Sequence, residues 1–107
     1  MSVERRPSEN QGMLLKDKVA IVTGGSGILG SAICELLAEQ EARVVINYYR
    51  KEKEAIVLVA RIQAHGGEAL ALRADIRDRG QVAHMVKVAV TQYGPVDVLV
   101  NDHPWPS

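Results

Sequence analysis

The sequence lacks several features that would assign it to a common class of protein. It has no net charge, since 13 basic residues balance 13 acidic ones, so nothing favours a nucleic acid or an anionic membrane as its partner. Its single cysteine, Cys34, excludes an internal disulfide and fits a reducing compartment. No apolar run approaches the length of a membrane-spanning helix.

The N-terminal stretch "MSVERRPSENQGM" has no apolar core of the kind that a secretory signal needs. We therefore expect a protein of the cytoplasm. Residues 1–12 are polar and contain a proline and a glycine, which predicts a flexible N-terminal arm. Hydrophobic residues make up 47% of the 107 residues, enough for one small domain, which we place at residues 13–101. Residues 102–107 then form a short tail.

Short apolar runs alternate with amphipathic segments along this domain. Four strands are expected, at residues 19–23, 43–47, 68–75 and 96–101. Apolar residues at helical spacing predict three helices between them: Leu29, Ala32, Ile33, Leu36 and Leu37; Ala55, Val59 and Ile62; and Val82, Met85, Val86, Ala89, Val90 and Tyr93. Asp78 can cap the third helix. The order βαβαβαβ predicts an α/β protein with parallel strands, right-handed crossovers and helices on both faces of the sheet.

The segment "GSGILG", Gly25 to Gly30, matches the pattern GxGxxG between the first strand and the first helix. Glycine allows a sharp turn there, lets a pyrophosphate approach the backbone N–H groups, and lets helix and strand pack closely. The helix N-terminus then attracts the anion. This context favours a dinucleotide site, and the alternative is a plain tight turn.

Other phosphate-binding motifs can be weighed against this one. A P-loop needs Gly-Lys-Ser/Thr at the end of the glycine run, but Ser31 follows Gly30 directly. A methyltransferase or an NAD-specific site usually has a carboxylate after the second strand, where this chain reads "NYYRK". Arg50 favours a 2′-phosphate there, and so NADP(H) over NAD(H) or a methyl donor. Alternatively, Arg50 and Lys51 merely begin a solvated helix.

Four stretches resemble the short-chain dehydrogenase/reductase family, and most closely its 3-oxoacyl-acyl-carrier-protein reductase-like branch. They are "TGGSGILG" (residues 23–30), "RVVINYYR" (43–50), "RADIRD" (73–78) and "VDVLVN" (96–101). The resemblance implies a Rossmann-type, three-layer αβα fold whose strands have the order 3-2-1-4. It also implies an NADP(H)-dependent oxidoreductase that transfers a hydride between the cofactor and a carbonyl or hydroxyl substrate.

The resemblance also implies which residues contact the cofactor. They are Gly24, Ser26, Gly27, Ile28, Leu29, Gly30, Tyr49, Arg50, Asp75, Ile76 and Asn101. Arg50 resembles the basic residue near the 2′-phosphate, Asp75 and Ile76 the pair at the adenine ring, and Asn101 the first residue of the family's Asn-Asn-Ala-Gly motif. For Asp75 the alternative is a simple turn-forming acid.

Two departures from the family pattern affect what we expect of the chain. Glycine stands at position 27 where the common turn has it at 28, a spacing closer to the TGxxGxxG of extended relatives. After Asn101 the chain reads Asp102-His103-Pro104 in place of Asn-Ala-Gly, and the family's later serine and Tyr-x-x-x-Lys pair do not follow. We therefore expect a truncated or frame-shifted member that has no catalytic residues and is inactive alone. Full-length relatives are homo-oligomeric by this resemblance, and the fourth strand should offer an open edge for self-association.

The remaining candidate residues predict no chemistry. Tyr49 and Lys53 spell Tyr-x-x-x-Lys, but they follow the second strand, far from where a hydride would be transferred. His65, His84 and His103 have no metal-ligand spacing, and Cys34 is expected to pack as a small apolar group. An alternative function is a nucleotide-binding or interaction module without catalysis, and a methyltransferase-like domain is less favoured.

Overall fold

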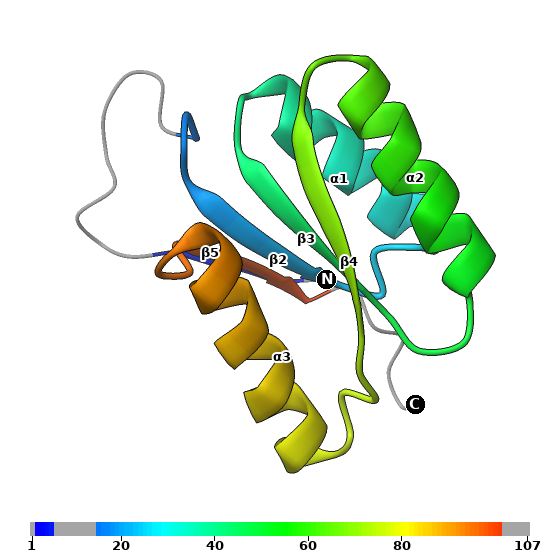
Figure 1. The fold of residues 1–107 in the computed structure, drawn as a ribbon, viewed down its shortest axis with the longest axis vertical. Helices are drawn as coiled ribbons and strands as arrows, with labels where there is room; N and C mark the ends of the chain where they lie inside the picture. The colour runs from blue at the N-terminus through cyan, green and yellow to red at the C-terminus, as the bar shows by residue number, and fades with distance from the viewer. Residues whose placement is uncertain (1, 6–14, 102–107) are drawn as a thin grey trace.

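The computed structural model describes residues 2–5 and 15–101, which form one sheet with helices on both of its faces (Figure 1). The elements in chain order are β1 (Ser2–Arg5), β2 (Val19–Thr23), α1 (Ile28–Glu39), β3 (Arg43–Tyr48), α2 (Glu52–Ala64), β4 (Glu68–Arg73), α3 (Arg79–Tyr93) and β5 (Val98–Asn101). Within these ranges, none of the helices is long and apolar enough to span a bilayer.

The strands are arranged in the order β1-β5-β2-β3-β4. β5, β2, β3 and β4 run parallel, with Ile21 of β2 opposite Val45 on one side and Leu99 on the other. Numbered as the four expected strands, this is the order 3-2-1-4, so the predicted Rossmann-type fold is confirmed. β2 lies in the centre of the parallel strands, which explains why its sequence "VAIVT" is apolar throughout and buried along its length.

The N-terminal residues differ from the flexible arm that composition predicts. Ser2–Arg5 forms β1, which pairs antiparallel with β5, so that Ser2 lies opposite Asn101 and Arg5 opposite Val98. The outer edge of β5 is therefore paired, and the expectation of an open edge at this strand is wrong. The other residues of the expected arm, and the tail at residues 102–107, lie outside the described residues.

Two clusters of buried side chains hold the layers together. Helices α1 and α2 cover one face of the sheet, where Ala20, Val22 and Val44 pack against them, and α3 covers the other face, where Ile21 and Val45 point (Figure 1). Because side chains alternate along a strand, β2 and β3 supply both clusters. Cys34 is fully buried in the first cluster, as expected for a small apolar side chain.

Each of these helices buries fewer of its apolar side chains against the sheet than their helical spacing suggests. Leu29 and Leu36, expected on the buried stripe of α1, are 55% and 63% exposed, whereas Cys34 is buried. In α3, Met85 and Ala89 are buried, but Val86 and Val90 are exposed. A single helix lying on a sheet buries the residues nearest its contact line, and i, i+4 neighbours such as Met85 and Ala89 form that line.

Candidate functional site

A cleft of about 610 Å³ opens where the parallel strands β2, β3 and β4 end. Its walls come from three successive connections: the glycine turn after β2, the loop between β3 and α2, and the loop between β4 and α3. The lining residues are Gly24, Ser26, Gly27, Ile28, Leu29, Asn47, Tyr48, Tyr49, Arg50, Lys51, Ala74, Asp75, Ile76 and Arg77. In open α/β sheets, ligands bind outside the carboxyl ends of the strands, and this cleft lies there.

The glycine turn folds back on itself tightly. Gly24 has a φ of +68°, a backbone conformation that favours glycine. A Cβ on Gly30 would lie 2.3 Å from the carbonyl oxygen of Gly24, so only glycine allows the first turn of α1 to pack against this loop. Gly25 is buried, and a Cβ there would be 3.0 Å from the carbonyl oxygen of Val22. Gly24 is therefore favoured by its backbone conformation, and Gly25 and Gly30 by the protein's own packing.

Gly27 differs from these three glycines. A Cβ at this position would meet only the carbonyl oxygen of Gly24, at 3.5 Å, which is an ordinary contact, and its φ of −76° is available to any residue. The protein's own packing therefore leaves room for a side chain at Gly27. Its α-carbon faces the cleft, so a bare backbone here leaves space for a ligand that approaches the main chain.

Helix α1 begins at this bare segment. Within the described part of the chain, Gly27 at the N-cap makes no side-chain capping hydrogen bond, and the first turn of α1 contains no acidic residue. The first N–H groups of a helix have no partner inside the helix and carry its positive dipole end. Ile28, the first residue of the helix, is 95% exposed at the rim of the cleft. The turn is thus suited to an anion.

The loop after β3 brings basic and aromatic side chains to the second wall. The guanidinium carbon of Arg73 lies 4.7 Å from the centroid of the Tyr49 ring, and that of Arg50 lies 5.5 Å from it. Arg73 also donates from Nε to the carbonyl oxygen of Tyr49, at 3.1 Å. These contacts hold the loop in place, and Arg50 and Lys51 bring positive charge to the cleft lining. Burial, reinforced by a hydrogen bond to Glu52, raises the pKa of Tyr48 at the start of this loop.

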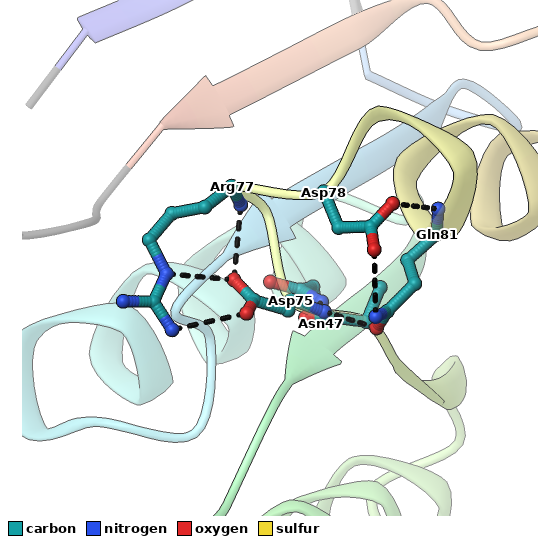
Figure 2. Close-up of polar contacts among 6 residues, drawn as sticks. Asn47, Asp75, Arg77, Asp78 and Gln81 are labelled. Carbon is teal, nitrogen blue, oxygen red and sulfur yellow. Dashed lines mark hydrogen bonds and ion pairs between the residues drawn. The ribbon is translucent and has the colours of Figure 1, made fainter.

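The loop after β4 forms the third wall, and its polar contacts are shown in Figure 2. Arg77 binds the carboxylate of Asp75 with two nitrogens, Nε to Oδ1 and Nη2 to Oδ2, each at 3.0 Å. The backbone N–H of Arg77 donates to the same Oδ1, also at 3.0 Å. The Asp75 carboxylate raises the pKa of Arg77. Gln81 accepts the backbone N–H of Asp75 at 2.8 Å, so α3 fixes this loop from the other side.

The cleft gathers all the residues expected at the cofactor except Gly30 and Asn101. Gly30 is buried under the glycine turn. Asn101, at the end of β5, accepts a hydrogen bond of 2.8 Å from the Thr23 hydroxyl. The cleft also includes Asn47 and Arg77, which the sequence reasoning did not place in the site. The run "RADIRD" could have predicted the position of Arg77, because a basic residue two positions after an aspartate can form an ion pair with its carboxylate.

The residues for which the sequence predicts no chemistry include Tyr49, Lys53 and the three histidines. Tyr49 lines the cleft, whereas Lys53 lines a neighbouring groove between α1 and α2, so the Tyr-x-x-x-Lys spacing does not bring the two into one hollow. His65 and His84 are exposed, and His103 lies outside the described residues. Across residues 2–5 and 15–101, no three His, Cys, Asp or Glu side chains group in a way that could hold a metal ion.

Comparison with known proteins gives this architecture a family. Residues 18–102 match the model of the family described as short chain dehydrogenase. An uncharacterized oxidoreductase of Methylorubrum extorquens is 44% identical over 88 residues, which is 82% of this chain and 36% of that protein. The 3-oxoacyl-[acyl-carrier-protein] reductase FabG of Staphylococcus aureus is 39% identical over 79% of this chain and 35% of its own length.

One further relative is matched over most of its own length. The short-chain dehydrogenase/reductase homolog YusS of Bacillus subtilis is 40% identical over 90 residues, which cover 84% of this chain and 83% of that protein. This chain therefore spans about a third of the length of the two oxidoreductases above and most of the length of YusS.

Solved structures show the same fold. A variant of a Serratia marcescens short-chain dehydrogenase/reductase superposes with a TM-score of 0.82 at 34% identity, over 87% of this chain and 38% of that one. A dehydrogenase/reductase from Sinorhizobium meliloti gives a TM-score of 0.80 at 39% identity, over 82% of this chain and 35% of that one. Sequence and fold agree, and the chain belongs to the short-chain dehydrogenase family.

Proposed function

We propose that the cleft binds NADP(H), and that this chain is the cofactor-binding portion of a reductase acting on carbonyl or hydroxyl groups. The family uses NAD(P) cofactors. The observation that carries the proposal is that one cleft joins a bare glycine turn at a helix N-terminus to the side chain of Arg50. The turn would hold a diphosphate on its backbone N–H groups.

The second wall supports the choice of NADP(H) over NAD(H). An NAD site usually has a carboxylate after the second strand, to bind the ribose hydroxyls, whereas residues 47–51 read "NYYRK". The cleft is lined there by Tyr49, Arg50 and Lys51. A guanidinium can bind a phosphate through two N–H groups. Arg50 would contact the 2′-phosphate, and Tyr49 would lie beside it.

The third wall would hold the adenine end of the cofactor. Asp75 and Ile76 line the cleft across from the glycine turn, and the fixed carboxylate of Asp75 can accept a hydrogen bond from an exocyclic amine. Gly24, Ser26, Gly27, Ile28, Leu29 and Gly30 would form the diphosphate turn. Asn101 lies outside the cleft lining, at the carboxyl end of β5, and would face the nicotinamide half.

The reaction follows from the family and from one relative. The name of the Staphylococcus aureus relative makes it a 3-oxoacyl-[acyl-carrier-protein] reductase, and we propose substrates of the 3-oxoacyl type for the protein to which this cofactor site belongs. NADPH would supply the hydride. Because the chain spans about a third of that relative's length, hydride transfer would need residues beyond this stretch, and the chain alone would bind without turnover. Its single thiol, on the buried Cys34, fits a cytoplasmic protein.

A titration with NADPH and NADH tests the cofactor proposal. We expect the chain to bind NADPH more tightly than NADH, and Arg50→Ala to weaken NADPH binding about tenfold while NADH binding stays unchanged. Arg79→Ala is the matched control, because Arg79 is exposed on α3 and lies outside the cleft lining. Equal affinities for the two cofactors would refute the NADP preference, and no affinity for either would refute the site.

An assay of NADPH oxidation with acetoacetyl-type substrates tests the second half of the proposal. The purified chain should bind NADPH and show no oxidation above the rate without protein. Clear turnover would show that groups within this chain act as acid and base, contrary to the proposal.

A further inference from the structure

Asn47 is a buried side-chain amide at the carboxyl end of β3, only 3% exposed. Its side-chain oxygen accepts the backbone N–H of Gly24 at 3.3 Å, and its side-chain nitrogen donates to the carbonyl oxygen of Ala74 at 3.1 Å. Gly24, Asn47 and Ala74 all line the cleft. One amide therefore connects the glycine turn on one side with the start of the Asp75 loop on the other.

Backbone bonds tie each wall to β3 only: the Gly25 N–H donates to the Asn47 carbonyl oxygen at 3.0 Å, and the Ala74 N–H donates to the Tyr48 carbonyl oxygen at 2.9 Å. The paired residues of β2 and β3 run from Val19 opposite Arg43 to Val22 opposite Ile46, so Gly24 lies beyond the last of them. Ala74 follows the last paired residues of β3 and β4, Tyr48 and Arg73. Beyond the paired residues, the side chain of Asn47 adds a direct link between Gly24 and Ala74.

The bridge needs both a donor and an acceptor. Gly24 offers an N–H, so its partner must be an oxygen, whereas Ala74 offers a carbonyl, so its partner must carry a hydrogen. The Asn47 nitrogen also lies 3.4 Å from the Tyr48 carbonyl oxygen and 3.5 Å from that of Leu72. An ionised carboxylate at this position could accept from Gly24 but would face these carbonyl oxygens with a negative charge and no hydrogen.

We propose that Asn47 is a positioning residue for the cofactor cleft: its amide sets the spacing between the glycine turn and the Asp75–Ile76 wall. The proposal rests on the proposed function, since the ligand is taken to be NADP(H). Asn47 contacts the walls and holds them in register for a ligand that touches both. Burial makes the two hydrogen bonds costly to lose, because an unpaired amide or carbonyl would remain inside the protein.

The test substitutes Asn47→Asp and follows NADP⁺ binding with pH. At pH 8 the carboxylate is ionised, and we expect affinity at least about tenfold below that of the unchanged protein. As pH falls, the buried acid becomes protonated well above the usual range of an aspartate, and its C=O and O–H then replace the amide's acceptor and donor. Binding should recover. Gln63→Glu, an exposed amide changed to an acid on α2, is the matched control and accounts for titration of the ligand.

The outcomes are distinct. Circular dichroism at each pH shows whether Asn47→Asp is folded. If Asn47 only stabilised the fold, the NADP⁺ affinity of the folded Asn47→Asp protein would not depend on pH more than that of the control. A folded Asn47→Asp that binds like Gln63→Glu at pH 8, or that does not recover at low pH, overturns the proposal. Should Asn47→Asp not fold at pH 8, Asn47→Ser decides: its one short hydroxyl cannot reach both walls, and affinity equal to that of the unchanged protein overturns the proposal.

A measurement without ligand separates this proposal from the proposed function. Amide hydrogen exchange at Gly24 should be faster in Asn47→Ser than in the unchanged protein, because the N–H loses its acceptor. If the unchanged protein binds no NADP⁺, the proposed function fails while this exchange result still tests the bridge. Unaltered exchange at Gly24 overturns the bridge itself, whatever the affinity.

Discussion

The β2–α1 unit and the β4–α3 unit both lead a strand into a helix at the rim of the same cleft, but they treat the helix N-terminus in opposite ways. In α3, the N-cap Asp78 accepts the backbone N–H groups of Gly80 and Gln81 at 2.9 and 3.2 Å. In α1, the N-cap is Gly27, which makes no side-chain capping bond in the described structure. The N–H groups at the start of α3 thus have a side-chain acceptor, whereas α1 has no side-chain cap.

This difference concerns where each helix N-terminus finds its acceptors. Every helix N-terminus needs acceptors for its first N–H groups, and a side-chain cap is the usual source. The cap on α3 therefore belongs to the structure of that helix. The bare N-terminus of α1 fits the proposal that a diphosphate completes the site. The two units should accordingly respond differently to matched substitutions, and the following predictions run from the largest expected effect to the smallest.

Gly30→Ala should have the largest effect. Its Cβ would lie 2.3 Å from the carbonyl oxygen of Gly24 and 2.9 Å from the α-carbon of Gly25, and backbone atoms cannot move aside as a side chain can. We expect the free energy of unfolding to fall by about 3 kcal/mol, measured by urea denaturation. Gly80→Ala in α3 is the matched control, since its Cβ would be 3.3 Å from the flexible Asp78 carboxylate, and its effect should stay within about 1 kcal/mol. Equal losses in the two variants would contradict the comparison.

Gly27→Ala should affect binding more than stability. Its Cβ makes only an ordinary contact of 3.5 Å, so the free energy of unfolding should change by less than about 1 kcal/mol. The same Cβ would occupy the space through which a diphosphate approaches the backbone, and we expect NADPH affinity to fall about tenfold, or about 1.4 kcal/mol. Titration with NADPH gives the affinity, and urea denaturation of the same preparation gives the free energy of unfolding. Retained affinity would mean that the ligand does not approach Gly27.

Asp78→Ala should cost stability by removing the cap of α3. An N-cap aspartate replaced by alanine lowers the free energy of unfolding by about 1 kcal/mol, because the N–H groups of Gly80 and Gln81 lose their acceptor. Asp78→Asn is the control, since asparagine caps equally well, and it should keep most of the stability. If both variants lost the same amount, the charge of Asp78 rather than its capping bonds would be responsible.

The sequence predicts the bounds of β2 better than those of the other strands, for physical reasons. The strand at Val19–Thr23 has the expected bounds because it is buried on both faces and so is apolar without interruption. The strand expected at residues 68–75 ends at Arg73, because the chain turns soon afterwards, at Ile76 and Arg77. Ser2–Arg5 gives no local sign of a strand, since "SVER" becomes one only by pairing with β5, far along the chain.

The same distinction applies to the site. The glycine turn and Arg50 could be identified because their residues lie close together in sequence and carry a recognisable pattern. Asn47 could not, because its partners Gly24 and Ala74 are 23 and 27 residues away, and the amide acquires its role only when three strands meet. Local motifs predict the groups that we propose to touch the ligand, whereas the proposed role of Asn47 depends on contacts that only the folded sheet makes.

The smallest predicted effect concerns alkaline pH and the far end of the β4–α3 unit. Burial, and then the charge of Glu68, raise the pKa of Tyr93, while Arg43 opposes them. The folded state therefore keeps the phenol proton at a pH where the unfolded chain loses it, so this contribution to stability is complete below about pH 10 and is lost as pH rises further. Urea denaturation from pH 8 to 11 should show a shallower decline for Tyr93→Phe than for the unchanged protein, and an intermediate one for Glu68→Gln. If the free energy of unfolding declined in parallel in all three proteins, the alkaline sensitivity would not come from Tyr93 and would lie outside the β4–α3 unit. It would not come from α1 either, because the described α1 contains no tyrosine.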